Sequence, residues 1–187
     1  MEKLKYQVET FIPCNEQEMR DKELLLRWIN SGVDILTRAN AVAHLTASAW
    51  VMSPDRKHVL MAYHNLYNSW AWLGGHADGD PDLLAVALRE ATEESGVQNV
   101  RPLSTEIASL DILPVWGHTK RGKYVASHQH LNVTYLLVAD ESDALTIRAE
   151  ENSGVAWLPA DRLLELTNEW EMDHVYLKLL ERAKALL

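Results

Sequence analysis

The chain has 187 residues, of which 47% are hydrophobic, a formal net charge of −9 and a single cysteine, Cys14. This length predicts one domain with modest additions, and the acidic balance without a basic stripe argues against a nucleic-acid polymer as partner. One cysteine excludes an intramolecular disulfide. Because the N-terminus lacks a signal-peptide core and no apolar run approaches the roughly 20 residues that span a bilayer, we expect no membrane partner and a cytoplasmic location.

The first predicted element is an amphipathic helix over Asn15–Asn30, with apolar residues at helical spacing and Gly32 as a stop. Next, residues 41–52 (AVAHLTASAWVM) and 57–64 (KHVLMAYH) flank a Ser-Pro-Asp-Arg turn and predict a hairpin. Residues 70–73 then continue as a short strand into Gly74-Gly75.

The most strongly patterned helix is Pro81–Ser95. Asp80 is its expected N-cap, Pro81 fits the first helical position and Gly96 fits the C-terminal stop. One face carries apolar residues at i, i+3, i+4 and i+7, which predicts that this face packs on a core: Leu84, Ala87, Leu88 and Ala91.

Strands are expected around 107–115, 125–139 and Trp157, followed by a short helix over 159–166 and a last helix near 172–187. This order predicts an α/β fold, with a mixed β-sheet covered by helices on both faces. We expect one domain, in which residues 1–39 are an N-terminal helical extension and residues 40–187 hold the core and the C-terminal helices. Apolar residues on the first helix are a candidate homodimer surface.

Three carboxylates gather on one face of the central helix. At about 100° per residue, Glu90, Glu93 and Glu94 fall within an arc of roughly 100°. Like charges this close destabilise an isolated helix, so the arrangement favours a bound cation over a plain solvated face. Arg89 lies four residues before Glu93 and is placed to hold it.

Residues 75–97, GHADGDPDLLAVALREATEESGV, resemble the Nudix box. That pattern is a glycine, five residues, a glutamate, seven residues and then R-E-U-x-E-E-x-G-U, where U is bulky and apolar. The matching residues, at the required spacing, are Gly75, Arg89, Glu90, Glu93, Glu94, Gly96 and Val97. The resemblance implies a Nudix-type α/β/α sandwich.

The resemblance further implies a hydrolase that cleaves a diphosphate linkage in a nucleoside-diphosphate-linked small molecule with Mg²⁺ or Mn²⁺. By position, Glu90 and Glu94 would be the main metal ligands, Glu93 a further ligand and catalytic residue, and Gly74 a carbonyl ligand. Arg89 would orient the glutamates. Oxygen ligands of this kind suit Mg²⁺, which bridges a diphosphate and lowers the pKa of bound water.

Two features of the box region leave alternatives open. The box has a glutamate where Pro81 stands, and either Asp80 or Asp82 is a candidate replacement. The family places its general base variably, and here Glu150 and Glu151 precede the Trp157 strand. Glu151 is the candidate base, against the alternative of a solvated loop.

A second constellation consists of histidines. His128 and His130 are two apart in a strand-like run and point to the same side, while His76 follows the glycine pair and His44 lies on an early strand. Such a set predicts a second metal or phosphate site, against the alternative of histidines that bond within the fold.

The histidine pattern also loosely resembles isopentenyl diphosphate isomerase, a Nudix relative. That family's reaction uses a cysteine two residues before the box-entry histidine, where this chain has Gly74. Isomerisation of an isoprenoid diphosphate therefore stands as an alternative function, as does a non-catalytic sensor of a nucleotide metabolite.

Two further groups are candidates for substrate contact. His118, Lys120, Arg121 and Lys123 form a basic loop that would lie near substrate phosphates or else be a solvated turn. Among the tryptophans, Trp70, Trp72 and Trp116 are candidates to stack on a nucleobase; packing is the expectation for most, with Trp116 the best exception. Substrate identity stays open among nucleoside triphosphates, nucleotide sugars, dinucleoside polyphosphates and ADP-ribose.

Overall fold

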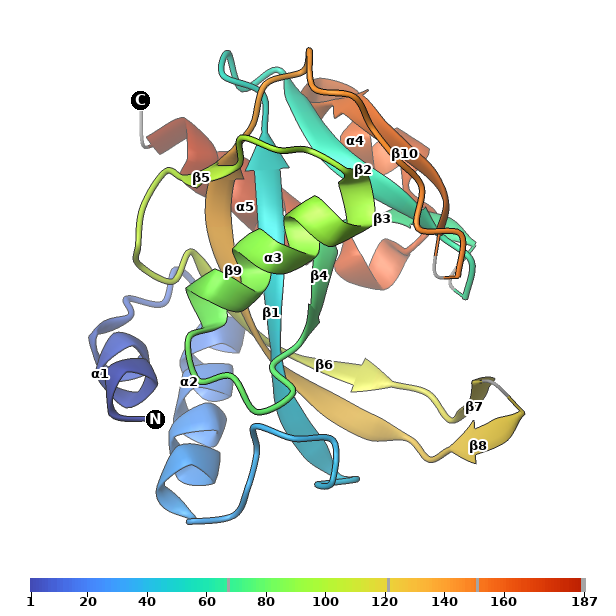
Figure 1. The fold of residues 1–187 in the computed structure, drawn as a ribbon. Helices are drawn as coiled ribbons and strands as arrows, with labels where there is room; N and C mark the ends of the chain where they lie inside the picture. The colour runs from blue at the N-terminus through green and yellow to red at the C-terminus, as the bar shows by residue number, and fades with distance from the viewer. Residues whose placement is uncertain (67, 121, 151, 186–187) are drawn as a thin grey trace.

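A mixed β-sheet forms the centre of the protein in the computed structural model, which describes residues 1–66, 68–120, 122–150 and 152–185 (Figure 1). The strands are β1 (Ala43–Met52), β2 (His58–His64), β3 (Ser69–Ala71), β4 (Leu73–His76), β5 (Arg101–Pro102), β6 (Ser109–Val115), β7 (His118–Lys120), β8 (Lys123–Val125), β9 (His128–Val138) and β10 (Asn152–Pro159). The α-helices are α1 (Glu2–Thr10), α2 (Glu16–Asn30), α3 (Leu83–Ser95), α4 (Leu163–Leu166) and α5 (Asp173–Ala185), with 3-10 turns η1 (Ala160–Arg162) and η2 (Trp170–Met172).

The sheet is built around one parallel pair. Its order is β10-β2-β1-β9-β5, with β3 on β2, β4 on β1 and β6 on β9. Strands β1 and β9 run parallel in register from Ala43–Gln129 to Met52–Val138, whereas the other pairings are antiparallel. All of β1 is buried, as expected for a strand covered on both faces. The predicted hairpin of β1 and β2 is confirmed.

Alternating residues of β1 enter two separate cores. Leu45, Ala47, Ala49 and Val51 pack in the core beneath α3 and the N-terminal helices, whereas Trp50 and Met52 pack against α4 and α5. The period of two along a strand produces this division. In Figure 1, α3 crosses in front of β1 and α5 lies behind it. The predicted mixed sheet with helices on both faces is therefore confirmed.

The N-terminal helices share the first core. Leu4 and Val8 of α1 and Leu25 of α2 are fully buried there with the sheet residues. Helix α2 begins where the sequence predicts, because the Asn15 side chain accepts a hydrogen bond from the Glu18 N–H at 2.9 Å. Helix α1 was not predicted. Among the apolar residues of α2, Met19 remains 40% exposed.

A buried ionic network ties α2 to α5 and β6. Glu18 is fully buried and accepts hydrogen bonds from both terminal nitrogens of Arg182, at 2.6 and 2.7 Å. Lys178 Nζ lies 3.0 Å from Glu18 and 2.5 Å from Asp111. Burial alone would raise the pKa of Glu18, but hydrogen bonds from Arg182 and Cys14 and the charge of Lys178 outweigh it and lower the pKa to about 2.

Several predicted boundaries differ from the observed ones. The strand predicted over 70–73 is two short strands, because the chain leaves β2 at Ala71 and joins β1 at Leu73. The strand predicted over 125–139 begins at His128, since residues 123–125 pair with β7 in a separate hairpin. That hairpin projects from the body at the lower right of Figure 1. Among the described residues, no helix is both long and apolar enough to cross a membrane.

Candidate active site and histidine cluster

Helix α3 presents the acidic cluster and is fixed at both ends. Asp82 is its N-cap and accepts a hydrogen bond from the Ala85 N–H, and Gly96 ends it in the left-handed conformation at φ 83°. The predicted start at Pro81 with Asp80 as cap is wrong by two residues. The reason is that the Asp80 carboxylate accepts the Asp82 N–H at 3.0 Å and so forms a turn before the helix.

The glutamates of α3 are buried to different degrees. Glu94 is 7% exposed and its Oε2 accepts a hydrogen bond from the Gly74 N–H at 3.0 Å. The Glu90 side chain is 15% exposed, whereas that of Glu93 is 47% exposed. Buried carboxylates of like charge are stable only when a positive group is close. The cluster therefore has the oxygen donors and the negative charge that suit a divalent cation.

The glycine pair of β4 makes room for this cluster. A Cβ atom on Gly75 would lie 2.5 Å from Glu90 Cδ, and one on Gly74 would lie 2.6 Å from the backbone oxygen of Ala47. Glycine at position 74 thus lets β4 lie against the β1 backbone, and glycine at position 75 leaves room for the end of the Glu90 side chain. This requirement explains the glycines at the entry of the box.

Arg89 of α3 forms an ion pair with Asp80, in the turn before the helix. Arg89 Nη1 lies 3.3 Å from Asp80 Oδ2. Of the two aspartates considered in place of the box glutamate, Asp80 thus contacts the arginine. Asp82 instead caps α3 and pairs with Lys3 at 2.9 Å.

A residue that the sequence did not single out, Arg148, supplies positive charge beside the glutamates. Arg148 Nη1 lies 3.6 Å from Glu93 Oε2 and 4.0 Å from Glu90 Oε2. Asn152 holds this segment to α3, because it accepts the Arg148 N–H at 3.0 Å and donates to the Glu94 carbonyl at 3.3 Å. Arg148 lies close before the Glu150–Glu151 pair, and that proximity was the available signal.

The predicted general base cannot be placed. Glu151 lies outside the described residues, and Glu150 is exposed in the turn before β10.

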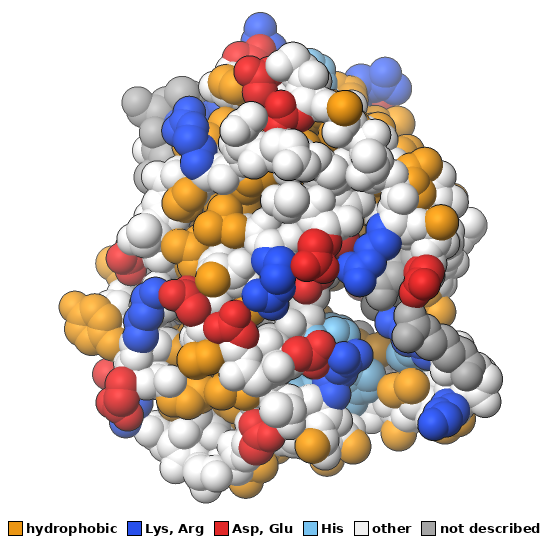
Figure 2. All heavy atoms as spheres, viewed as in Figure 1, with side chains coloured by type: hydrophobic (Ala, Val, Ile, Leu, Met, Phe, Trp, Pro, Cys, Tyr) orange, Lys and Arg blue, Asp and Glu red, His pale blue; other side chains and the backbone are white. Residues whose placement is uncertain are grey.

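The histidines singled out in the sequence meet at the ends of β1, β4 and β9. His44 pairs with His130 across the parallel strands, and Thr46 pairs with His76 on the other side of β1. Ring centroids of His44 lie 5.1 Å from His76, 4.8 Å from His128 and 5.3 Å from His130. Figure 2 shows histidine side chains beside a hollow, with charged side chains around it.

Burial keeps these rings from taking up a proton. It lowers the pKa of His44, and together with nearby positive groups it lowers that of His76 to about 4 and that of His130 to about 2. The rings of His44, His76 and His130 are therefore neutral near pH 7. Neutral imidazoles do not attract phosphate by charge, which favours the metal alternative over the phosphate alternative for this cluster.

The tryptophan candidates divide as expected. Trp70 packs edge-on against Tyr63 at 5.3 Å, and Trp72 packs edge-on against Tyr176 at 5.7 Å. Trp116 is 80% exposed and follows Val115, which pairs with His128. Trp116 is thus a solvent-exposed side chain just after β6.

The basic loop forms the tip of the projecting hairpin. Lys120 and Lys123 are exposed on β7 and β8, and His118 Nδ1 hydrogen-bonds to the Trp116 carbonyl at 2.9 Å. Arg121 lies outside the described residues.

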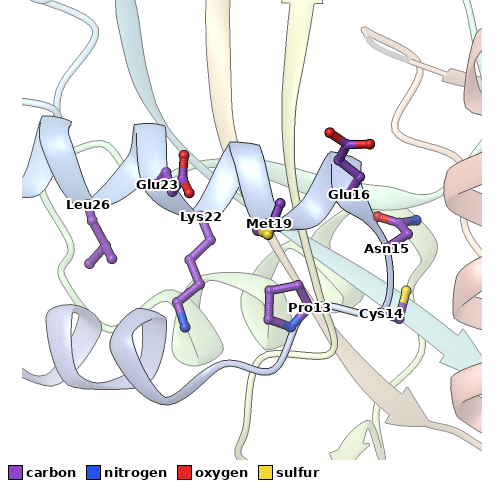
Figure 3. A pocket seen from close by; sticks show the side chains of 8 residues that line it. All are labelled: Pro13, Cys14, Asn15, Glu16, Met19, Lys22, Glu23 and Leu26. Carbon is purple, nitrogen blue, oxygen red and sulfur yellow. The ribbon is translucent and has the colours of Figure 1, made fainter.

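Two cavities lie away from this region. One, of about 710 Å³, is bordered by α2 and the segment before it, where Figure 3 shows Lys22 and Leu26 pointing toward α1 and Cys14 on the connecting segment. The other, of about 420 Å³, lies between α1, α5 and the segment before β6. Residues of α3 line neither of these two cavities. Cys14 thus lies with the N-terminal helices, beside the first of these cavities.

Solved structures share the fold at low sequence identity. A NUDIX-family hydrolase from Clostridium perfringens has a TM-score of 0.53 and 22% identity, covering 77% of this chain and 98% of that one. The Nudix hydrolase RenU from M. Smegmatis has a TM-score of 0.52 and 17% identity, covering 77% and 88%. The NUDIX domain of Shewanella oneidensis NrtR, complexed with ADP ribose, has a TM-score of 0.53 and 20% identity, covering 83% and 94%.

A comparison with curated proteins gives no match. A family model described as NUDIX domain matches residues 42–179, which include the glycine pair, α3 and the strands that position them. This match spans well over half of the chain and confirms the resemblance seen in the box. The chain belongs to the NUDIX domain family.

Proposed function

We propose that this chain, a Nudix pyrophosphohydrolase, uses Mg²⁺ or Mn²⁺ to cleave a diphosphate linkage in a nucleoside-diphosphate-linked small molecule. One observation carries the proposal. The carboxylates of Glu90 and Glu94 lie against Gly75 and Gly74, in a family whose box motif this segment matches.

The residues present fit a divalent cation. Glu90 and Glu94 are the main candidate ligands, Glu93 a further one and the Gly74 carbonyl another. Glu90 and Glu94 are largely buried, and carboxylate and carbonyl oxygens are the donors that Mg²⁺ prefers. When bound, such an ion would lower the pKa of a water molecule and offset charge on the departing phosphate.

The remaining residues orient the glutamates and the substrate. In this proposal Arg89, which pairs with Asp80, helps to orient the glutamates of α3. Arg148 lies close enough to Glu90 and Glu93 to contact a phosphate that arrives beside them. Glu93 is the most exposed glutamate of the cluster and is suited to contact water, with Glu151 proposed as the general base.

Two observations support a nucleotide as one part of the substrate. Trp116 offers an exposed ring that can stack on a base. The related NUDIX domain of Shewanella oneidensis NrtR forms a complex with ADP ribose, which is a nucleoside diphosphate linked to a sugar.

A hydrolysis screen tests the proposal. The purified protein is incubated with nucleoside triphosphates, nucleotide sugars, dinucleoside polyphosphates and ADP-ribose in Mg²⁺ or Mn²⁺, and ³¹P NMR in ¹⁸O-labelled water identifies the phosphorus attacked. We expect metal-dependent cleavage of at least one class, abolished in Glu94→Gln and retained in Glu16→Gln, a variant on the exposed face of α2.

Two outcomes would overturn the proposal. Tight binding of a panel member without phosphate release would identify a sensor. An allylic product from isopentenyl diphosphate, without hydrolysis, would identify an isomerase.

A further inference from the structure

The strand ladder brings three imidazoles to one point. His44, His76 and His130 each offer a ring nitrogen, and these atoms lie within 4.8 Å of one another. Adjacent positions in a sheet share a face, so the pairing of β1 with β4 and β9 fixes this convergence in the backbone. The cluster depends on three separate strands and is therefore built into the fold.

Two of these rings have a buried nitrogen without a partner. Within the part of the chain that the structure describes, Nε2 of His44 and Nε2 of His130 are buried and accept or donate no hydrogen bond. His44 is only 4% exposed. Buried polar atoms are nearly always satisfied, so these nitrogens indicate a ligand at the centre of the cluster.

The hydrogen bonding of His44 prepares it as a ligand. Its Nδ1 lies 3.0 Å from the Asn40 carbonyl oxygen, which can only accept. Nδ1 therefore carries the hydrogen, and Nε2 of the neutral ring presents a lone pair to the other histidines. A carbonyl that holds the far nitrogen in this way is the usual second partner of a metal-bound histidine.

The donor set selects the kind of ion. Imidazole nitrogens suit zinc, copper, iron, cobalt and nickel, whereas Mg²⁺ requires oxygen ligands. Metal–nitrogen bonds of about 2.0–2.1 Å in a tetrahedral site separate the ligand atoms by about 3.4 Å. The candidate ligand atoms lie within 4.8 Å of one another, so an ion would draw the rings closer together. The adjacent charges of Arg38 and Asp78 neutralise each other in a two-point ion pair at 2.8 Å.

We propose that His44, His76 and His130 bind one divalent transition-metal ion of the zinc type, at a site distinct from the carboxylates of α3. His128 stacks on His44 beside these three rings, and a fourth ligand of such an ion would be water or a ligand oxygen. The two sites are neighbours along β4, because His76 directly follows Gly75. This proposal does not depend on hydrolysis by the protein.

Cobalt binding tests the site without an activity assay. The metal-free protein is titrated with Co²⁺ in excess Mg²⁺, which occupies oxygen sites, while visible absorption reports tetrahedral nitrogen coordination. We expect one Co²⁺ per chain, displaced by Zn²⁺. His130→Ala and His76→Ala should each weaken binding at least about a hundredfold, and circular dichroism should show that they remain folded.

Matched controls separate this site from others. His174→Ala changes an exposed histidine of α5, and His58→Ala removes a histidine from a second group of candidate ligands that also contains Asp55 and Glu141. Both variants and Glu94→Gln should bind Co²⁺ like the wild type. Loss of the absorption in Glu94→Gln but not in His130→Ala would overturn the proposal, as would a wild-type protein that binds no Co²⁺. If His130→Ala does not fold, His76→Ala, at a half-buried position, decides the matter.

Discussion

Two clusters of charge in this protein use the same residue types in opposite ways. In the network of Glu18, Asp111, Lys178 and Arg182, each buried carboxylate contacts a cation from another element. On α3, the three glutamates share one turn of the helix, and Arg148 Nη1 lies 3.6 Å from Glu93 Oε2 and 4.0 Å from Glu90 Oε2. The first cluster joins α2 to α5 and is structural. The second gathers three carboxylates on one turn of a helix, and such oxygen donors suit a divalent cation.

The difference teaches how to separate structure from function in a charged cluster. Removal of a partner from a closed network leaves a buried charge uncompensated and lowers stability. Removal of a carboxylate from an overcharged cluster relieves repulsion and should instead lower activity. Substitutions in and around the two clusters test this contrast.

Glu18→Gln should have the largest effect on stability. It leaves Arg182 beside a neutral side chain while Lys178 keeps Asp111, and breaking a buried pair of this kind costs about 3–5 kcal/mol. Urea unfolding measures the loss, and kcat at a temperature where the variant is folded should equal that of the wild type. A loss of about 1 kcal/mol or less, the contribution of an exposed ion pair, would show that the network is not structural.

Glu90→Gln should show the opposite pattern, a large loss of activity without a loss of stability. Loss of a metal ligand should lower kcat/KM by at least about a hundredfold, while the free energy of unfolding stays the same or rises. Hydrolysis rates at several Mg²⁺ concentrations and urea unfolding provide the two readouts. Wild-type activity in this variant would remove Glu90 from the proposed metal site.

The pH dependence of stability should follow Glu18. Because its folded pKa of about 2 lies below the ordinary value of 4.5, its contribution is present above about pH 5 and is lost as pH falls toward 2. Unfolding free energies between pH 7 and pH 3 should therefore fall more steeply for the wild type than for Glu18→Gln. Parallel curves for the two proteins would contradict this assignment.

The two glycines of β4 should respond differently to alanine. In Gly75→Ala the added Cβ meets the end of the Glu90 side chain, which can shift, so we expect about a tenfold loss of kcat with little change in stability. In Gly74→Ala it meets the backbone of β1, which cannot shift easily, so stability should fall as well. Equal stability losses in both variants would argue against the specific role of Gly75.

Trp116→Ala should have the smallest effect. Loss of one stacked ring is worth about 1 kcal/mol, so KM for a nucleotide substrate should rise several-fold at unchanged kcat. Trp170, which is 77% exposed on η2, provides the matched control. If Trp170→Ala raises KM equally, Trp116 does not stack on the substrate.

Much of the architecture could be predicted from the sequence because its signals are local. Asn15 and Gly32 bound α2, Gly96 ends α3, and the turn at residues 53–56 sets the first hairpin. The spacing of the α3 glutamates depends on helix geometry alone, so their shared face could be predicted too. The histidines could be grouped because strand alternation and the glycine pair are visible in the chain.

The remaining features depend on contacts between distant segments. Helix α1 has only Leu4 and Val8 fully buried, too weak a pattern to predict without the core that they enter. The contacts of Arg148 with Glu90 and Glu93 join residues far apart in sequence, and the nearby Glu150–Glu151 pair gives only a weak signal for them. The two-residue error at the start of α3 arose because Asp80 and Asp82 are equally good caps, and the hydrogen bonds of the turn decide between them.

Anomalous diffraction from a crystal soaked in Mn²⁺ tests the central claim most directly. The account predicts an ion bound between the carboxylates of Glu90 and Glu94, absent from Glu94→Gln crystals treated in the same way. Wild-type crystals with no anomalous peak at these carboxylates, at a Mn²⁺ concentration that supports full activity, would contradict it.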